Sequence, residues 1–366
     1  MLSRHALIVL TFSFIGIVLL YILIRCLNLT YLPYFGDEAE YMWYAYTALH
    51  DPAQRFISLE VGKQPLFIWL TMFYIQFIGT PLLAGRLVSV TAGLLTMLGV
   101  WFLTFRLFNN RSLSYIAAAV FIFSPFAELI NRLGNFDSTV GMFYIWSLFF
   151  TVLLVQTVRL DVAYTLGLSL AGGILTKSSA FFSLYLLPVA FILFDFTNHH
   201  YRRRFITLLI LFGVAVLLAY SLYSLLQLSP YYERIAWFNG SFVYPKREWL
   251  HLDTGFRLAL FRDNLFVLSD YFVYYITLPF LAFIPLALWF GRQHMRVLLL
   301  LLAYSFLPLL ALAVFGRGIG SRWIYPFTLP LIPVIAHGLH SVIIVLWQRR
   351  KIYHPGMRLI LVPSLL

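Results

Sequence analysis

The sequence predicts an all-α protein that crosses a membrane many times, and three observations carry this prediction. First, 61% of its 366 residues are hydrophobic and only 11% are charged, whereas a soluble domain is about half apolar and a quarter charged. Second, apolar runs of roughly 20 residues, the length that crosses a bilayer as a helix, recur along the whole chain. Third, basic residues fall in the short loops on one side of these runs. We expect about ten transmembrane helices.

The first run begins close to the N-terminus. Arg4 precedes it and no cleavage site of small residues follows, so we expect an uncleaved first span. Cys26 is the single cysteine, which excludes an intrachain disulfide. Val162–Thr176 and Ala180–Phe194 are short and could form a re-entrant pair. The expected spans are Ala6–Ile24, Leu87–Phe105, Leu113–Ile130, Thr139–Val158, Val162–Thr176, Ala180–Phe194, Phe205–Leu228, Tyr271–Phe290, Val297–Phe315 and Trp323–Trp347.

Charge decides the place of a further apolar run, Pro65–Gly79, which is short for a span. If it does not cross, one set of loops holds half of the basic residues but only Asp161 and Asp195 of the 14 acids. Basic residues favour the cytoplasmic side. If it did cross, Arg202–Arg204 would lie outside while Arg4 stayed inside. We therefore expect a juxtamembrane helix in the first outer loop. The inner basic residues are then Arg4, Arg106, Arg111, Arg159, Arg202, Arg203, Arg204, Arg292, Arg296, Arg349, Arg350, Lys351 and Arg358.

Two long outer segments remain, 29–86 and 229–270, and the first is rich in tyrosine and tryptophan, as suits helices at the headgroup level. We expect one transmembrane domain over residues 1–366. The net charge of +12 follows from the inner loops and does not indicate a nucleic-acid partner. The apolar run at 359–366 resembles a span cut short, so a continuation beyond it stays open.

Asp37 and Glu38 directly follow the first span, in the first outer loop. Asp37 with Glu40 three residues later resembles a helix N-cap box. A carboxylate at a helix start is also held rigidly in its charged form, and it can accept the proton of an attacking hydroxyl. For Asp37 the local sequence leaves cap and catalytic base equally open.

Other ionisable residues lie in loops on the same predicted face. Lys63 precedes the juxtamembrane helix, where it could be a snorkelling lysine. Asp137 stands before a long span, a position typical of a cap. Lys177 interrupts an apolar stretch, where an unpaired lysine is costly, so a functional role is the default hypothesis.

Arg317 and Arg322 lie in a glycine-rich outer loop. Its backbone could approach an anion closely and arginine binds phosphate with two prongs, although an ordinary tight turn would look the same. His337 and His340 share a helix face without a third ligand, so we expect polar packing rather than a metal site. No Walker-type or dinucleotide glycine motif is present, which argues against an ATP-driven pump.

Taken together, five separate stretches place ionisable residues on one face. This pattern is typical of an anionic-substrate site with an acid–base carboxylate. The residues are Asp37, Lys63, Asp137, Lys177 and Arg322.

At these residues the chain resembles the protein O-mannosyltransferase and aminoarabinose transferase branch of the glycosyltransferase C superfamily (family 39-type). The resemblance covers roughly residues 6–348. Two positions depart from the family pattern: Gln64 stands in place of a proline and Ser178 in place of a glycine. The matching segments are Asp37-Glu38, Lys63-Gln64-Pro65-Leu66, Arg86-Leu87, Asp137, Leu175-Thr176-Lys177-Ser178 and Arg322-Trp323-Ile324-Tyr325-Pro326.

The resemblance implies an inverting enzyme that moves a sugar from a polyprenyl- or dolichyl-phosphate carrier to a lipid, glycan or protein acceptor on the outer face of the cytoplasmic membrane. Asp37 is then the catalytic base, and Glu38 and Asp137 belong to the catalytic group. The resemblance requires no cofactor and leaves a divalent cation possible. The residues implied to hold the donor phosphate are Lys63, Lys177, Arg317 and Arg322.

Two other classes stay open. A lipid or solute transporter would place ionisable residues near the middle of the bilayer and often shows inverted repeats, and neither is evident here. A non-catalytic relative is the other alternative.

Overall fold

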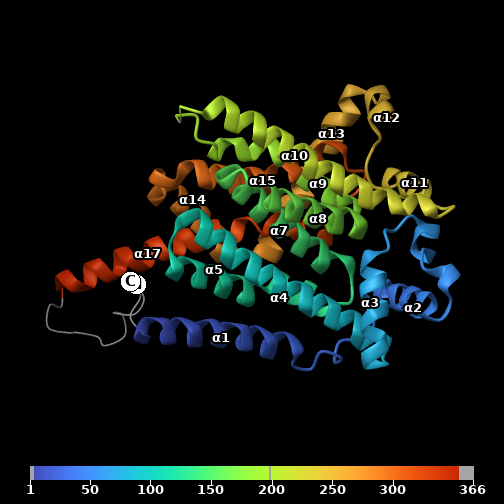
Figure 1. Cartoon of the computed structure of the whole chain (residues 1–366), viewed down its shortest axis with the longest axis horizontal. Helices are drawn as coiled ribbons and strands as arrows, with labels where there is room; N and C mark the ends of the chain where they lie inside the picture. The colour runs from blue at the N-terminus through green and yellow to red at the C-terminus, as the bar shows by residue number, and fades with distance from the viewer. Residues whose placement is uncertain (1–3, 198, 354–366) are drawn as a thin grey trace.

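The computed structural model describes residues 4–197 and 199–353, in which the chain is almost wholly helical (Figure 1). No β-strand forms in these ranges. An isolated β-bridge joins Val243 and Gly316. The predicted fold class is therefore confirmed. The apolar run at 359–366 lies outside the described residues. The long helices are α1 (Arg4–Cys26), α4 (Pro81–Phe108), α7 (Phe136–Thr157), α8 (Leu160–Thr176), α10 (Tyr201–Tyr223), α15 (Met295–Phe315) and α17 (Leu331–Tyr353).

The core of the bundle is a row of helices in which α4 packs on α7, α7 on α8 and α8 on α10. Gly167 allows the last contact, because a Cβ atom there would lie 2.9 Å from the carbonyl oxygen of Ala215. Small residues at helix contacts are typical of membrane bundles, where close packing drives association. On the outer surface of α10, Ile210 and Leu217 are 61% and 69% exposed. Apolar surface of this kind suits contact with lipid.

Three of the expected spans are broken, so their prediction as continuous helices is wrong. Helices α5 (Arg111–Phe123) and α6 (Pro125–Arg132) meet at 63°, because a proline starts the second helix.

Helices α13 (Thr254–Tyr271) and α14 (Leu278–Phe290) belong to a pair bent by 100°, and Thr277 between them has a φ of 68°. Helix α16 (Tyr325–Thr328) ends just before Pro330, and α17 then begins. The predicted spans that the structure breaks are Leu113–Ile130, Tyr271–Phe290 and Trp323–Trp347.

By length and composition, five helices of the described chain could cross a membrane, or up to seven if each bent pair is one span. The chain is a multi-pass membrane protein. Several further apolar helices are shorter, among them the segment from Ser178 to Leu193, which contains the five-residue α9 (Phe181–Tyr185).

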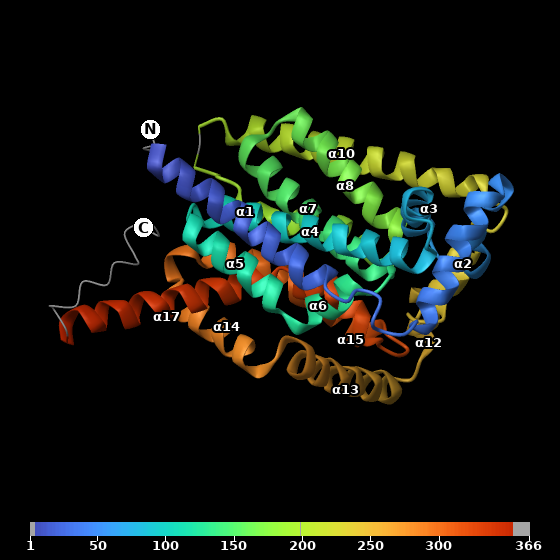
Figure 2. The same cartoon turned by 90° about the horizontal axis from the view of Figure 1, so that it is seen from below.

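The two ends of the bundle differ. Short helices gather at the end opposite the N-terminus of α1 (Figure 2), where the first predicted outer loop forms α2 (Gly36–His50) and α3 (Leu66–Ile78). The second forms α11 (Arg234–Gly240), α12 (Lys246–His251) and α13. At the other end, Arg106 Nε donates to Gln156 Oε1 at 2.6 Å and Arg204 Nη2 donates to the Gln156 carbonyl at 3.3 Å. Loops that the charge pattern assigns to one side thus meet at one end.

Candidate functional site

Four of the predicted site residues form a chain of alternating charges at the end that carries α2. Asp37 of α2 pairs with Arg322 through Oδ2 and Nη2. Arg322 Nη1 also lies 3.8 Å from Asp137 Oδ2 at the start of α7. Lys177 Nζ, just after α8, donates to Asp137 Oδ1 at 2.6 Å. Side chains from four distant segments therefore share one site.

Asp37 does not cap its helix, so the N-cap interpretation is wrong. Helix α2 begins at Gly36, and its cap is the backbone of Phe35, whose N–H donates to Glu38 Oε2 at 3.0 Å. Glu38 reaches back to complete the first turn, which moves the helix start ahead of Asp37. The Asp37 carboxylate is left to pair with Arg322, and it is 35% exposed.

Asp137 is not a cap either, which corrects the second cap assignment. The cap of α7 is Asn135, whose Oδ1 accepts from the backbone N–H of Asp137 at 3.1 Å. The Asp137 side chain is only 4% exposed, between Lys177 and Arg322. A buried carboxylate is stable when paired in this way. Asp137 therefore pairs with two cations from a buried position, whereas Asp37 remains partly exposed.

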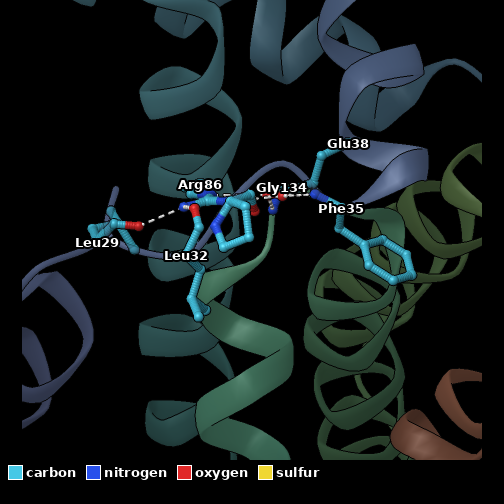
Figure 3. A network of polar contacts seen from close by, with 7 residues as sticks. Leu29, Leu32, Phe35, Glu38, Arg86 and Gly134 are labelled. Atoms are coloured by element: carbon cyan, nitrogen blue, oxygen red, sulfur yellow. Dashed lines mark hydrogen bonds and ion pairs between the residues drawn. The ribbon is translucent and has the colours of Figure 1, made fainter.

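Glu38 and Arg86 form a fully buried ion pair beside the site, with both side chains 0% exposed (Figure 3). Arg86 Nε and Nη2 donate to the two carboxylate oxygens at 2.9 and 2.8 Å. Its remaining N–H groups donate to the carbonyls of Leu29, Leu32 and Pro33 at 2.8 to 3.0 Å. All five donors of the guanidinium are thereby used.

This buried pair fixes the backbone that carries both site aspartates. Glu38 Oε1 also accepts from the backbone N–H of Gly134 at 2.6 Å, in the loop that leads into α7. The network joins the segment after α1, the start of α2, α4 and the α6–α7 loop. Glu38 stands in the predicted catalytic group, yet its carboxylate is occupied by Phe35, Arg86 and Gly134. The sequence identified Arg86 only as part of the Arg86-Leu87 motif. An arginine at the start of an apolar helix was the one feature that could have indicated its buried role.

Lys63 lies beside the charged chain but pairs with a different acid. Its Nζ donates to Glu40 Oε2 at 2.6 Å and lies 4.8 Å from the centre of the Tyr41 ring. Burial raises the pKa of the Tyr41 hydroxyl well above its usual range, and the charges of Asp37 and Asp137 raise it further. Tyr41 therefore stays protonated next to the carboxylates, whereas the sequence pattern indicated only an aromatic side chain at the headgroup level.

The two arginines of the glycine-rich loop separate. Arg322 stacks over the Phe35 ring at 4.8 Å. Partial burial acts to lower the pKa of its guanidinium, but the charges of Asp137 and Asp37 outweigh burial and raise it. Arg317 pairs instead with Glu248 of α12 and lies 4.2 Å over the Tyr244 ring. Arg317 thus engages Glu248 and Tyr244 rather than the Asp37 cluster.

The histidines lie apart from the site. The His337 ring centre is 5.1 Å from that of Phe108 and 5.7 Å from that of His294. Within the part of the chain that the structure describes, no three His, Cys, Asp or Glu side chains form a group that could hold a metal ion.

A model of the family described as "Dolichyl-phosphate-mannose-protein mannosyltransferase" matches residues 62–224. This range contains Lys63, Arg86, Asp137 and Lys177. No significant match was found among curated proteins.

Solved structures share the fold over nearly the whole chain. ArnT from Cupriavidus metallidurans in the apo state matches with a TM-score of 0.62 and 15% identity, over 99% of this chain and 67% of ArnT. The same protein bound to undecaprenyl phosphate matches with a TM-score of 0.64 and 14% identity, over 99% of this chain and 68% of ArnT. The archaeal oligosaccharyltransferase AglB from Archaeoglobus fulgidus, in complex with an inhibitory peptide and a dolichol-phosphate, matches with a TM-score of 0.56 and 13% identity. The match covers 97% of this chain and 52% of AglB.

The chain therefore has the fold of the membrane-embedded glycosyltransferases of the C superfamily. The resemblance inferred from its sequence motifs is confirmed.

Proposed function

We propose that this protein is a membrane glycosyltransferase that moves a sugar from a polyprenyl-phosphate carrier to a hydroxyl or amine acceptor. The observation that carries the proposal is the convergence of Asp37, Asp137, Lys177 and Arg322 at one end of the bundle. A phosphate needs cations, and an attacking hydroxyl needs a base. The site offers both within one chain of ion pairs.

In the proposed reaction, Asp37 accepts the proton of the acceptor while the acceptor atom forms a bond to the anomeric carbon. The bond from that carbon to the phosphate oxygen breaks, its electron pair stays on the phosphate, and configuration inverts. Arg322, now paired with Asp37, would move toward the phosphate, which would free the carboxylate. Lys177 and Arg322 would stabilise the charge that builds on the leaving phosphate.

Asp137 and Glu38 take positioning roles in this proposal. Asp137 holds Lys177 and Arg322 from its buried position, and Glu38 with Arg86 fixes the helix start that carries Asp37. Lys63 lies over the Tyr41 ring and pairs with Glu40, and in this proposal it joins the phosphate-binding residues once Glu40 releases it. Arg317 is the implied phosphate ligand that the geometry supports least.

The test is sugar transfer in membranes that contain the full chain, with a radiolabelled polyprenyl-phosphate sugar as the probe and membranes without the chain as control. Label should move from the lipid to an acceptor fraction. Movement of intact labelled lipid between leaflets, with the sugar still attached, would instead identify a transporter. Absence of both would favour a non-catalytic relative.

We also propose that the site faces the outer side of the cytoplasmic membrane, with the N-terminus inside. The charge partition supports this, because Asp195 lies among loops with Arg204 and Arg296, as expected of the cytoplasmic side. In a background without Cys26, the exposed positions Tyr34→Cys and Ser241→Cys should react with an impermeant thiol reagent from outside. Asp195→Cys should react only after the membrane is opened, and the reverse pattern would contradict the orientation.

A further inference from the structure

The two positions at which the chain departs from the family pattern contact each other. Gln64 Nε2 donates a hydrogen bond to Ser178 Oγ, across 114 residues of sequence. Asn239 Nδ2 of α11 donates to the same oxygen at 2.9 Å. A serine hydroxyl has two acceptor lone pairs, so it accommodates both bonds. The three side chains form one hydrogen-bonded group, here called the Ser178 node.

The Ser178 node lies one residue away from each site lysine. Gln64 follows Lys63, and Ser178 follows Lys177. Gln64 is 3% exposed, so its bond to Ser178 is shielded from water. A proline at position 64 would restrict the backbone after Lys63 through its ring. Glutamine does not restrict the backbone in this way. Its side-chain hydrogen bond to Ser178 restrains the loop instead through a contact between distant segments.

Asn239 connects the node to α11, which is packed tightly on the same loop. Gly62, with a φ of 78°, has no room for a side chain, because a Cβ atom there would lie 2.4 Å from Phe238 Cβ. Arg234 of α11 donates to the carbonyl of Glu60. The segment that carries Asn239 is therefore anchored beside Lys63 independently of the node.

The same part of the chain also contacts the loop that carries Arg322. The Phe242 ring packs edge-on against Trp323, the neighbour of Arg322, with ring centres 5.0 Å apart. The Phe242 carbonyl accepts from the backbone N–H of Arg317 at 2.9 Å. Residues 234–242 thus contact a neighbour of each of Lys63, Lys177 and Arg322.

We propose that Gln64, Ser178 and Asn239 are positioning residues that fix the separation of Lys63 and Lys177, so that both ammonium groups engage one lipid-linked phosphate. This inference rests on the proposed function. The node touches neither lysine nitrogen; it acts through the backbone of the two loops and through α11. Loss of the shared hydroxyl lets the two loops move apart.

The experiment measures binding of undecaprenyl phosphate to the purified full chain in detergent, alongside melting without the lipid. Asn239→Ala removes one buried hydrogen bond and should raise the dissociation constant about tenfold. Ser178→Ala removes the acceptor of both hydrogen bonds and should raise it at least as much. Ser178→Thr keeps the hydroxyl and should bind within about threefold of the unmodified chain. The double variant should be no worse than Ser178→Ala, because Ser178→Ala already removes the bond that Asn239→Ala deletes.

Two further variants keep the test sharp. Ser269→Ala removes an exposed hydroxyl that donates to the Phe266 carbonyl at 2.7 Å, and it should leave binding unchanged. Gln64→Pro combined with Ser178→Gly restores both family residues, and it should recover affinity that Ser178→Gly alone loses, since proline restricts the loop by itself.

An unchanged affinity for undecaprenyl phosphate in Ser178→Ala and Asn239→Ala would contradict the positioning role. The same holds if these variants melt at lower temperature but bind the lipid as tightly as the unmodified chain. If the unmodified chain neither binds undecaprenyl phosphate nor transfers sugar, the proposed function fails instead. The two failures are therefore distinguishable.

Discussion

Asp37 and Glu38 are neighbours in sequence but occupy opposite environments. Glu38 and its partner Arg86 are both 0% exposed, and hydrogen bonds satisfy the polar atoms of both side chains. Asp37 and its partner Arg322 are 35% and 27% exposed, and one ion pair joins them. A fully buried ion pair is costly to separate, whereas a partly exposed ion pair is weak enough for a charged ligand to displace one partner. Under the proposed function, the two adjacent acids take different roles: Glu38 fixes the start of α2 and Asp37 is available for chemistry.

The largest effect expected is on rate, from Asp37→Asn. Asparagine cannot accept a proton, so transfer from the lipid donor should fall about 10²–10⁴-fold. Stability should change by less than about 1 kcal/mol, because the pair with Arg322 is partly exposed. The measurement is turnover normalised to folded protein by thermal melting in detergent. Near-normal turnover would move the search for the base to Asp137.

Arg86→Ala should show the opposite profile, with loss of stability first. It leaves the Glu38 carboxylate buried without its cation, at about 3–5 kcal/mol in unfolding free energy. Equilibrium unfolding in detergent checks this. Arg159→Ala is a matched control, since its pair with Asp161 is exposed, and its melting temperature should not change. Normal stability of Arg86→Ala would remove the distinction between the two pairs.

Lys177→Gln should weaken affinity for the lipid phosphate about tenfold, the scale of one charge-assisted hydrogen bond. Asp137 would keep Arg322 at 3.8 Å, so part of the site should survive. Titration with undecaprenyl phosphate measures the effect. An unchanged dissociation constant would make Lys177 a structural partner of Asp137.

The smallest effect is expected from Arg317→Gln, less than about threefold in donor affinity, because Arg317 pairs with Glu248 rather than with Asp37. Arg322→Gln in the same assay is the comparison and should lose more. An equal loss in both variants would restore Arg317 to the phosphate site.

The structure also shows where local patterns misled. Asp37 and Asp137 each sit near a helix start and resemble caps, but caps are decided by which side chain reaches the free N–H groups. Glu38 reaches the backbone N–H of Phe35, and Asn135 reaches that of Asp137. Three spans predicted as continuous are interrupted, two of them at bends of 63° and 100°, because hydropathy does not register a single proline or a positive φ.

The sequence by itself determined the membrane class, the helical fold and the set of loops that carry the ionisable residues. Apolar length and loop charge are local and additive, so they can be counted along the chain. Only the tertiary structure decided the partners: Arg322 for Asp37, Arg86 for Glu38, and Gln64 for Ser178. The first of these pairs spans 285 residues. A pairing over such a distance depends on how the helices pack, and no local pattern encodes it.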